Sequence, residues 1–291
     1  MTTLGAVLLP QLPPERMRDV AQAADEAGLP ELWLWEDCFL TSGVAAASAA
    51  LAWTRQVRVG VGLLPAPLRN VALTAMEVAT LHRLFPGRVH IGVGHGVQDW
   101  MAQVGARAES PMTLLREYVT ALRALLAGER VTVHGRYVRL DRVALDWPPA
   151  APAPVHVGAV GPRTLHLAGE VADGAILTGG TTPAQVSAAR DRVLRGREAA
   201  GRADPPRITV YLHAATGPDA AARMAAEQAR WGYPGGDDDR TVTGDAAEIA
   251  AQVRRWARAG ADSVVLQPTP DDPDPEGFVR FVAQDVRALL D

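Results

Sequence analysis

The sequence of 291 residues contains no lysine and a single cysteine, so all 29 of its basic side chains are arginine. Without lysine the chain cannot form a Schiff base with a carbonyl substrate or with pyridoxal phosphate. It also cannot supply the lysine of a Walker-type nucleotide site. The lone cysteine, Cys38, excludes an internal disulfide and a cysteine-rich metal site. These absences narrow the possible chemistry before any motif is considered.

Strong charge of one sign and long apolar runs are also missing. The formal net charge is only -4, which disfavours an extended surface for nucleic acid or anionic lipid. No apolar run approaches the roughly 18 residues of a membrane span. The N-terminal apolar run before Pro10 lacks the basic flank of a signal peptide. We therefore expect a cytoplasmic protein with a small-molecule substrate and with neither a nucleic-acid nor a membrane partner.

Short apolar runs alternate with longer amphipathic segments along the whole chain. Uninterrupted apolar runs are typical of parallel strands that are buried on both faces of a sheet. Eight β/α units in 291 residues predict an α/β fold, a (β/α)8 TIM barrel that forms one domain over residues 1–291. The expected strands are Leu4–Leu9, Leu32–Trp35, Val57–Leu64, Val89–Val93, Val155–Val157, Ala175–Leu177, Ile208–Leu212 and Ser263–Leu266.

Helical spacing and turn residues occupy the segments between these runs. The stretch Val131–Leu140 predicts a small hairpin inserted after the fourth β/α unit, and the glycine-rich stretch Gly232–Thr243 predicts a loop. A doubly wound open sheet is the alternative fold, but prolines follow the first strand where that fold usually has a glycine-rich turn. Helices are expected at Pro13–Gly28, Ser42–Trp53, Val71–Phe85, Met112–Ala127, Arg163–Gly169, Pro183–Ala200, Asp219–Trp231, Ala246–Ala259 and Glu276–Leu290.

Glycines are crowded at the ends of the expected strands, where the functional residues of a (β/α)8 barrel lie. The loop at 158–163 runs directly into a helix, whose free N–H groups and dipole favour a phosphate. A second glycine pair follows the next strand. The alternative is that these glycines only pack helices against strands and shape turns. The candidate cofactor residues in the two loops are Gly158, Ala159, Val160, Gly161, Pro162, Arg163, Thr178, Gly179 and Gly180.

Acidic and imidazole side chains at strand ends are the candidates for catalysis. Glu36 and Asp37 follow the second strand, and only one of two neighbours in an extended chain can face the barrel centre. Either one acts as a site acid, or it caps a helix or pairs with an arginine. His95 lies between two glycines after the fourth strand and is expected to hydrogen-bond a ligand. Because no HExxH or paired-carboxylate motif occurs, no metal site is predicted.

Several segments, taken in this order, resemble the luciferase-like flavin and deazaflavin oxidoreductase family. They are Ala27–Asp37, Val57–Pro65, Gly87–Gly96, Gly158–Pro162, Ala168–Gly174 and Ala259–Leu266. The fold of that family is the (β/α)8 barrel, and its chemistry takes place on a flavin-type ring. Within the family, this sequence is most similar to the branch that uses the deazaflavin coenzyme F420, which includes methylenetetrahydromethanopterin reductases.

The resemblance implies roles for particular residues. Gly62 and Leu63 would span the family's cis peptide bond, which supports the back of the ring. The residues Gly94, His95 and Gly96 would contact the ring or its side chain, and the loops at 158–162 and 178–180 would hold the phosphate. The function implied is hydride transfer between F420 and a small organic substrate, by an enzyme that forms a homodimer.

The sequence departs from its relatives at two places. Deazaflavin sugar dehydrogenases have an active-site histidine after the second strand, where this chain has Glu36, Asp37 and Cys38. They have a glutamate after the glycine loop, where this chain has Val97 and Gln98. These differences disfavour a sugar phosphate substrate and leave Glu36 or Asp37 as the proton donor. Two alternatives stay open: an FMN-dependent luciferase-like monooxygenase, and a non-catalytic flavin-binding or partner subunit of the same fold.

Overall fold

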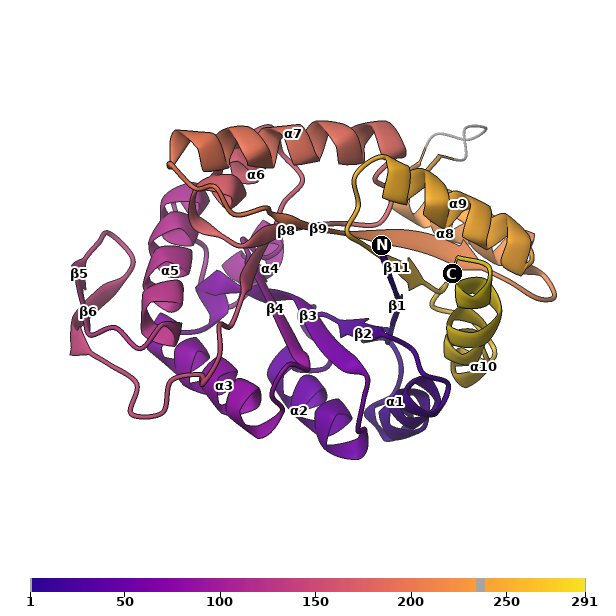
Figure 1. Ribbon diagram of the computed structural model, residues 1–291, viewed down its shortest axis with the longest axis horizontal. Helices are drawn as coiled ribbons and strands as arrows, with labels where there is room; N and C mark the ends of the chain where they lie inside the picture. Colours follow the sequence, from indigo (N-terminus) through magenta and orange to yellow (C-terminus); the bar gives the residue numbers. More distant parts are fainter. Residues whose placement is uncertain (1, 234–238, 291) are drawn as a thin grey trace.

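The computed structural model describes residues 2–233 and 239–290, and parallel strands in this part of the chain close into an eight-stranded barrel (Figure 1). Each strand pairs with the next along the chain, and the last strand pairs with the first. All eight expected strands are present, so the predicted barrel is confirmed. Its strands are β1 Thr3–Val7, β2 Glu31–Leu34, β3 Arg58–Pro65, β4 Val89–Gly94, β7 Val155–Gly158, β8 Gly174–Leu177, β9 Arg207–Ala215 and β11 Ser263–Gln267.

Helices surround the barrel and cover the outward side chains of its strands (Figure 1). On β9, Val210 and Leu212 face these helices, whereas Tyr211 belongs to a separate apolar cluster inside the barrel. Both faces of the strand are therefore apolar, which explains the uninterrupted runs in the sequence. The surrounding helices are α1 Met17–Glu26, α2 Gly43–Trp53, α3 Val71–Leu84, α5 Pro111–Leu126, α6 Pro162–Val171, α7 Pro183–Ala199, α9 Ala246–Arg258 and α10 Pro275–Phe281.

Shorter elements complete the connections. The turns η1 Pro14–Arg16 and η2 Ala66–Leu68 precede α1 and α3, and α10 continues into a π-helical segment, η3 Val282–Val286. None of the helices in the described ranges combines the length and the apolar character needed to cross a membrane.

A hairpin between α5 and β7 is the insertion that the sequence predicts after the fourth β/α unit. Its strands, β5 Val131–His134 and β6 Arg139–Val143, pair antiparallel and project outside the ring of helices (Figure 1). A short helix after β4, α4 Gln98–Gln103, was not expected. It is anchored by Met101, which is fully buried.

A second insertion extends the C-terminal end of β9. Here α8 Ala220–Trp231 leads to β10 Thr241–Thr243, which pairs in parallel with His213, Ala214 and Ala215. The predicted loop over Gly232–Thr243 is therefore wrong at its end, because a strand of three residues is too short to leave a sequence pattern. Residues 234–238 of that loop lie outside the described residues.

Candidate active site

The residues expected to support the ring, Gly62 and Leu63, lie on β3 beside β4. The peptide bond between Gly62 and Leu63 is cis, as the resemblance implied. A Cβ atom on Gly94 or on Gly158 would lie 2.5 Å or 2.1 Å from Cδ2 of Leu63. These two glycines therefore make room for the Leu63 side chain, which rests on both strands. We call Gly62, Leu63, Gly94 and Gly158 the Leu63 platform.

Two hydrogen bonds hold the backbone of the Leu63 platform in place. The Tyr211 hydroxyl donates to the Gly62 carbonyl oxygen at 3.0 Å, and the Glu36 N–H donates to the Leu63 carbonyl oxygen at 3.2 Å. Burial raises the pKa of Tyr211, so this hydroxyl keeps its proton and remains a donor. Sequence reasoning missed Tyr211 because it lies within an apolar strand and carries no motif.

The two acidic candidates occupy different surroundings. One Glu36 carboxylate oxygen accepts the N–H of Gly43, the first residue of α2, at 2.8 Å. The other is paired with the guanidinium of Arg69, which also lies 3.4 Å from a carboxylate oxygen of Glu77. Glu36 thus makes the contacts of the alternative interpretation, one with a helix N-terminus and one with an arginine.

The second acidic candidate, Asp37, lies beside the indole of Trp35. Burial raises the pKa of its carboxyl, while the Trp35 indole N–H and the charge of Arg230 act in the opposite direction. The indole N–H of Trp35 donates to the carboxylate at 2.9 Å, and the Trp35 ring packs on Tyr211 with centroids 5.6 Å apart. The Trp35 ring, which packs on Tyr211 inside the barrel, therefore holds the Asp37 side chain at the end of β2.

His95 connects two elements of the site. Its Nε2 lies 3.2 Å from the hydroxyl of Thr164 in α6, and burial lowers its pKa, which favours a neutral ring. The amide of Gln98 donates at 3.3 Å to the carbonyl oxygens of both His95 and Gly96. These contacts fix the loop after β4 against the start of α6. His95 Nδ1 is buried and has no hydrogen-bond partner among the described residues.

The loop after β7 leads to a helix start that can accept an anion. Helix α6 begins at Pro162 with Gly161 as its N-cap residue, and no side chain in the described ranges caps it. A Cβ on Gly161 would meet no described atom within 4 Å, and Val160, Pro162 and Arg163 are exposed. The first N–H groups of α6 therefore remain available to a phosphate, with the Arg163 charge beside them.

The loop after β8 differs, because its glycines face side chains. Helix α7 is closed by a complete capping box between Thr182 and Gln185. A Cβ on Gly179 would lie 2.3 Å from Nε2 of His213, and one on Gly180 would lie 2.3 Å from the Tyr233 hydroxyl oxygen. Of the predicted residues in this loop, Thr178 is exposed, whereas the two glycines allow close packing of β9 and the α8 insertion.

Cations elsewhere at this end of the barrel already have partners. Arg240 donates to the Gly180 carbonyl oxygen at 3.3 Å and lies over the Tyr233 ring, 5.8 Å from its centroid. On the β7 side, the backbone N–H of the candidate residue Ala159 donates to the Ile176 carbonyl oxygen at 3.0 Å.

In the described parts of the chain, no cluster of three or more His, Cys, Asp or Glu side chains is placed to hold a metal ion.

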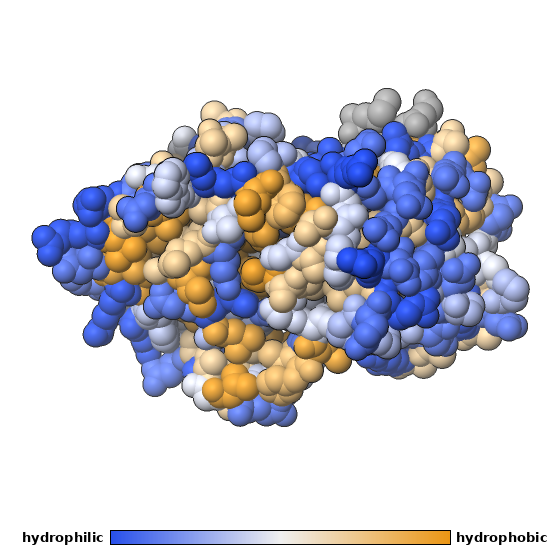
Figure 2. Space-filling view, turned by 90° about the horizontal axis from the view of Figure 1, so that it is seen from below, coloured by the Kyte–Doolittle hydropathy of each residue, from blue (hydrophilic) through white to orange (hydrophobic). Residues whose placement is uncertain are grey.

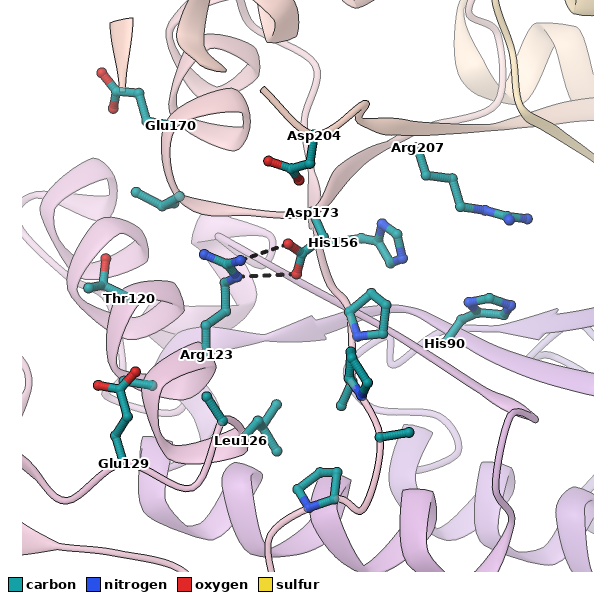
Figure 3. A pocket seen from close by; sticks show the side chains of 18 of the residues that line it. His90, Thr120, Arg123, Leu126, Glu129, His156, Glu170, Asp173, Asp204 and Arg207 are labelled. Carbon is teal, nitrogen blue, oxygen red and sulfur yellow. Dashed lines mark hydrogen bonds and ion pairs between the residues drawn. The ribbon is translucent and has the colours of Figure 1, made fainter. Parts of the chain in front are cut away.

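A cavity of about 1180 Å³ opens at the opposite end of the barrel and contains none of the candidate residues. It is bordered by His90, His156 and Arg207 near the starts of β4, β7 and β9, and by the Arg123–Asp173 ion pair (Figure 3). Arg207 also donates to the fully buried Glu31 at 2.6 Å. The charges here pair with one another, as expected for the end of a barrel that contributes to stability.

Comparisons with known proteins identify relatives of this chain. A family model described as luciferase-like monooxygenase matches residues 2–267. The chain is 31% identical over 229 residues to 5,10-methylenetetrahydromethanopterin reductase of Methanolobus tindarius, a match that covers 78% of this chain and 69% of that protein. It is 32% identical over 205 residues to F420-dependent glucose-6-phosphate dehydrogenase of Nakamurella multipartita, covering 66% of this chain and 60% of that protein.

Solved structures share the fold along the whole chain. Coenzyme F420-dependent tetrahydromethanopterin reductase from Methanopyrus kandleri superposes with a TM-score of 0.83 at 22% identity, covering 100% of this chain and 99% of that one. An F420-dependent secondary alcohol dehydrogenase, in complex with an F420–acetone adduct, gives a TM-score of 0.88 at 21% identity with the same coverage. Since the family model extends over most of the sequence, the chain belongs to the luciferase-like monooxygenase family.

Proposed function

We propose that this protein is an oxidoreductase that transfers a hydride between coenzyme F420 and a small organic substrate. The observation that carries the proposal is that the Leu63 platform and the uncapped N-terminus of α6 lie side by side. The platform includes residues of the adjacent strands β4 and β7, and α6 follows β7. A flat ring needs a firm apolar support, and a phosphate needs free N–H groups. The curated relatives named as F420-dependent support the deazaflavin over FMN.

The residues present fit such a cofactor. Leu63, for which Gly94 makes room, would support the ring, and the N–H groups at Arg163 and Thr164 would hold the phosphate. Gly96 supplies the positive φ that the loop after β4 needs. When bound, the deazaflavin supplies a carrier of two electrons and a hydride, and the protein contributes binding and orientation. The remaining candidates, the exposed backbone at Val160 and Gly161 and the threonine at 178, would border its polar side chain.

Asp37 is the proposed proton donor of the reaction. Its raised pKa keeps a proton on the carboxyl at higher pH than usual, and the Trp35 indole fixes its position at the end of β2. Glu36 and His95 act through their neighbours: Glu36 orders Arg69 and the start of α2, and His95 orders the start of α6.

Titration of the purified protein with F420 and, separately, with FMN tests the cofactor. We expect micromolar binding of F420, followed by fluorescence, and FMN affinity at least about tenfold weaker. Tight binding of FMN alone, with oxygen consumption when reduced FMN is supplied, would instead establish the monooxygenase. Binding of neither cofactor would favour the non-catalytic partner subunit.

We also propose that the chain forms one barrel domain over residues 1–291 and acts as a cytoplasmic homodimer. Helix α3 exposes Leu73, Met76 and Leu84 next to the alanine-rich α2. Figure 2, which views the side of α1, α2 and α3, shows apolar residues gathered at its centre and lower edge. A face of this kind favours association, and the free thiol of Cys38 suits a reducing compartment. Met76→Asp should convert a dimer into a monomer in light scattering, whereas a wild-type monomer would refute the dimer.

A further inference from the structure

An aromatic cluster covers the ends of β8 and β9, at the same end of the barrel as the Leu63 platform. Trp231 and Tyr233 are stacked, with centroids 6.4 Å apart and an interplanar angle of 16°. His213 lies 5.9 Å from the Tyr233 ring and 6.1 Å from the Trp231 ring. We call His213, Trp231 and Tyr233 the aromatic wall. Trp231 ends α8 and is 55% exposed, so the wall presents a flat apolar surface to the outside.

His213 connects this wall to the barrel interior. It follows Tyr211 by two residues on β9, so both side chains point to the inside of the barrel. The imidazole is buried, and its Nε2 lies 3.3 Å from the Tyr233 hydroxyl. Its Nδ1 has no hydrogen-bond partner among the described residues. Burial lowers the pKa of His213 to about 4, so the ring is neutral and adds no charge to the wall.

The loop that carries Asp37 lies near the wall. The Trp35 indole N–H donates to Asp37 at 2.9 Å, and the Trp35 ring packs on Tyr211, which is two residues before His213 on β9. Phe39 and Leu40 follow Asp37 and are 66% and 49% exposed. Large exposed apolar side chains therefore follow the proposed proton donor along the chain, which is unusual for a surface that binds a highly hydrated substrate.

The positive charges around this region already have partners. Arg230 pairs with Glu227 at 3.6 Å, Arg69 pairs with Glu36, and Arg240 lies over the Tyr233 ring. The chain also has no lysine. A phosphate on the substrate would need unpaired cations or free N–H groups next to Asp37. The uncapped start of α6 supplies such groups, but in the proposed function it holds the cofactor.

From these observations we infer that the aromatic wall selects the substrate, and that the substrate is an uncharged ketone or secondary alcohol with an apolar ring or chain. The inference rests on the proposed function. In the reducing direction, Asp37 would give its proton to the carbonyl oxygen, and the carbonyl carbon would receive the hydride that a bound, reduced deazaflavin supplies. The ketone becomes an alcohol and the deazaflavin is oxidised, so electrons and protons balance. Trp231 and Tyr233 hold the apolar part of the molecule.

The experiment compares two exposed tryptophans in the full-length protein with F420. Trp147 is the control, because it is 70% exposed in the connector before β7, where Arg83 lies over its ring at 5.0 Å from the centroid. We expect Trp231→Ala to raise KM for cyclohexanone about tenfold, equivalent to about 1.4 kcal/mol of lost binding. The change should leave kcat within about twofold and F420 affinity unaltered. Trp147→Ala should change none of these quantities, and Trp231→Phe should restore most of the affinity.

Two further measurements separate the possible failures. Saturation-transfer NMR with cyclohexanone, on the complex with oxidised F420, should show ligand contact in the wild type and in Trp147→Ala, and a much weaker signal in Trp231→Ala. Turnover of glucose 6-phosphate in preference to cyclohexanone and cyclohexanol, or equal effects of the two tryptophan substitutions, would overturn the inference while leaving F420-dependent catalysis in place. Failure of the wild-type protein to bind F420 would overturn the proposed function as well.

Discussion

Mild acid should destabilise this protein strongly, because it buries neutral histidines. Burial lowers the pKa of His90 to about 4, that of His156 to about 3 and that of His213 to about 4. The unfolded chain binds protons at these imidazoles near pH 6.5, whereas the folded protein does not. Stability from this source is therefore fully present above pH 6.5 and is lost as the pH falls from 6.5 towards 4.

The expected loss follows from proton linkage. At pH 5.5, one unit below the unfolded pKa, a histidine that stays neutral in the folded state reduces the free energy of unfolding by about 1.4 kcal/mol relative to pH 7.5. The three histidines with lowered pKa values together reduce it by about 4 kcal/mol, a large part of a typical domain stability. Most carboxyl groups of the unfolded chain are still ionised at pH 5.5, so they change this sum little.

Urea unfolding followed by tryptophan fluorescence, at constant ionic strength and pH 7.5, 6.5 and 5.5, measures this loss. His156→Gln is the informative variant: its stability can be lower at every pH, but its loss between pH 7.5 and 5.5 should shrink to about 3 kcal/mol. A wild-type change below about 1 kcal/mol would refute the reasoning. So would proton NMR spectra of the folded protein in which these three imidazoles titrate near pH 6.5.

Three further predictions concern the site. Asp37→Asn should lower kcat about a hundredfold without changing F420 affinity, and kcat/KM of the wild type for ketone reduction should fall as pH rises through the raised pKa of Asp37. Gly158→Ala should destabilise the protein by about 2 kcal/mol, because its Cβ would lie 2.1 Å from Leu63, whereas Gly161→Ala, which meets no described atom within 4 Å, should change stability by less than about 0.5 kcal/mol in urea unfolding. Glu36→Gln should lower the free energy of unfolding by about 2 kcal/mol in the same assay, because Arg69 keeps its charge but loses its carboxylate partner in a mostly buried pair.

The fold could be read from the sequence because parallel strands with two buried faces leave uninterrupted apolar runs. All eight runs match barrel strands, and the hairpin was found from its turn residues. The elements that were missed are short. Helix α4 has six residues and β10 has three, and both depend on contacts made only after folding, such as those of Met101 and of Ala215. Neither contact is visible in a local pattern.

The candidate site was proposed from the strand ends, but the contacts of its residues could not be predicted. Sequence alone suggested that glycines at 94, 158, 179 and 180 leave room for a ligand. The structure shows that a side chain already lies beside each of them: Leu63 beside the first two, His213 and Tyr233 beside the others. The choice between Glu36 and Asp37 likewise depends on Arg69, more than thirty residues away along the chain. Such pairings are set by tertiary packing.

The Leu63 platform and the aromatic wall are supported by different parts of the fold, so substitutions have different consequences in each. The Leu63 platform is bonded through Tyr211 to the closed interior of the barrel, where a substitution disturbs several strands at once. The Trp231 and Tyr233 part of the aromatic wall belongs to the insertion between β9 and α9, which adds one strand to the edge of β9. Substitutions in that insertion can alter substrate choice while the cofactor support stays intact. In such barrels new substrates arise through changes in the loops and insertions at the strand ends, with the barrel itself preserved.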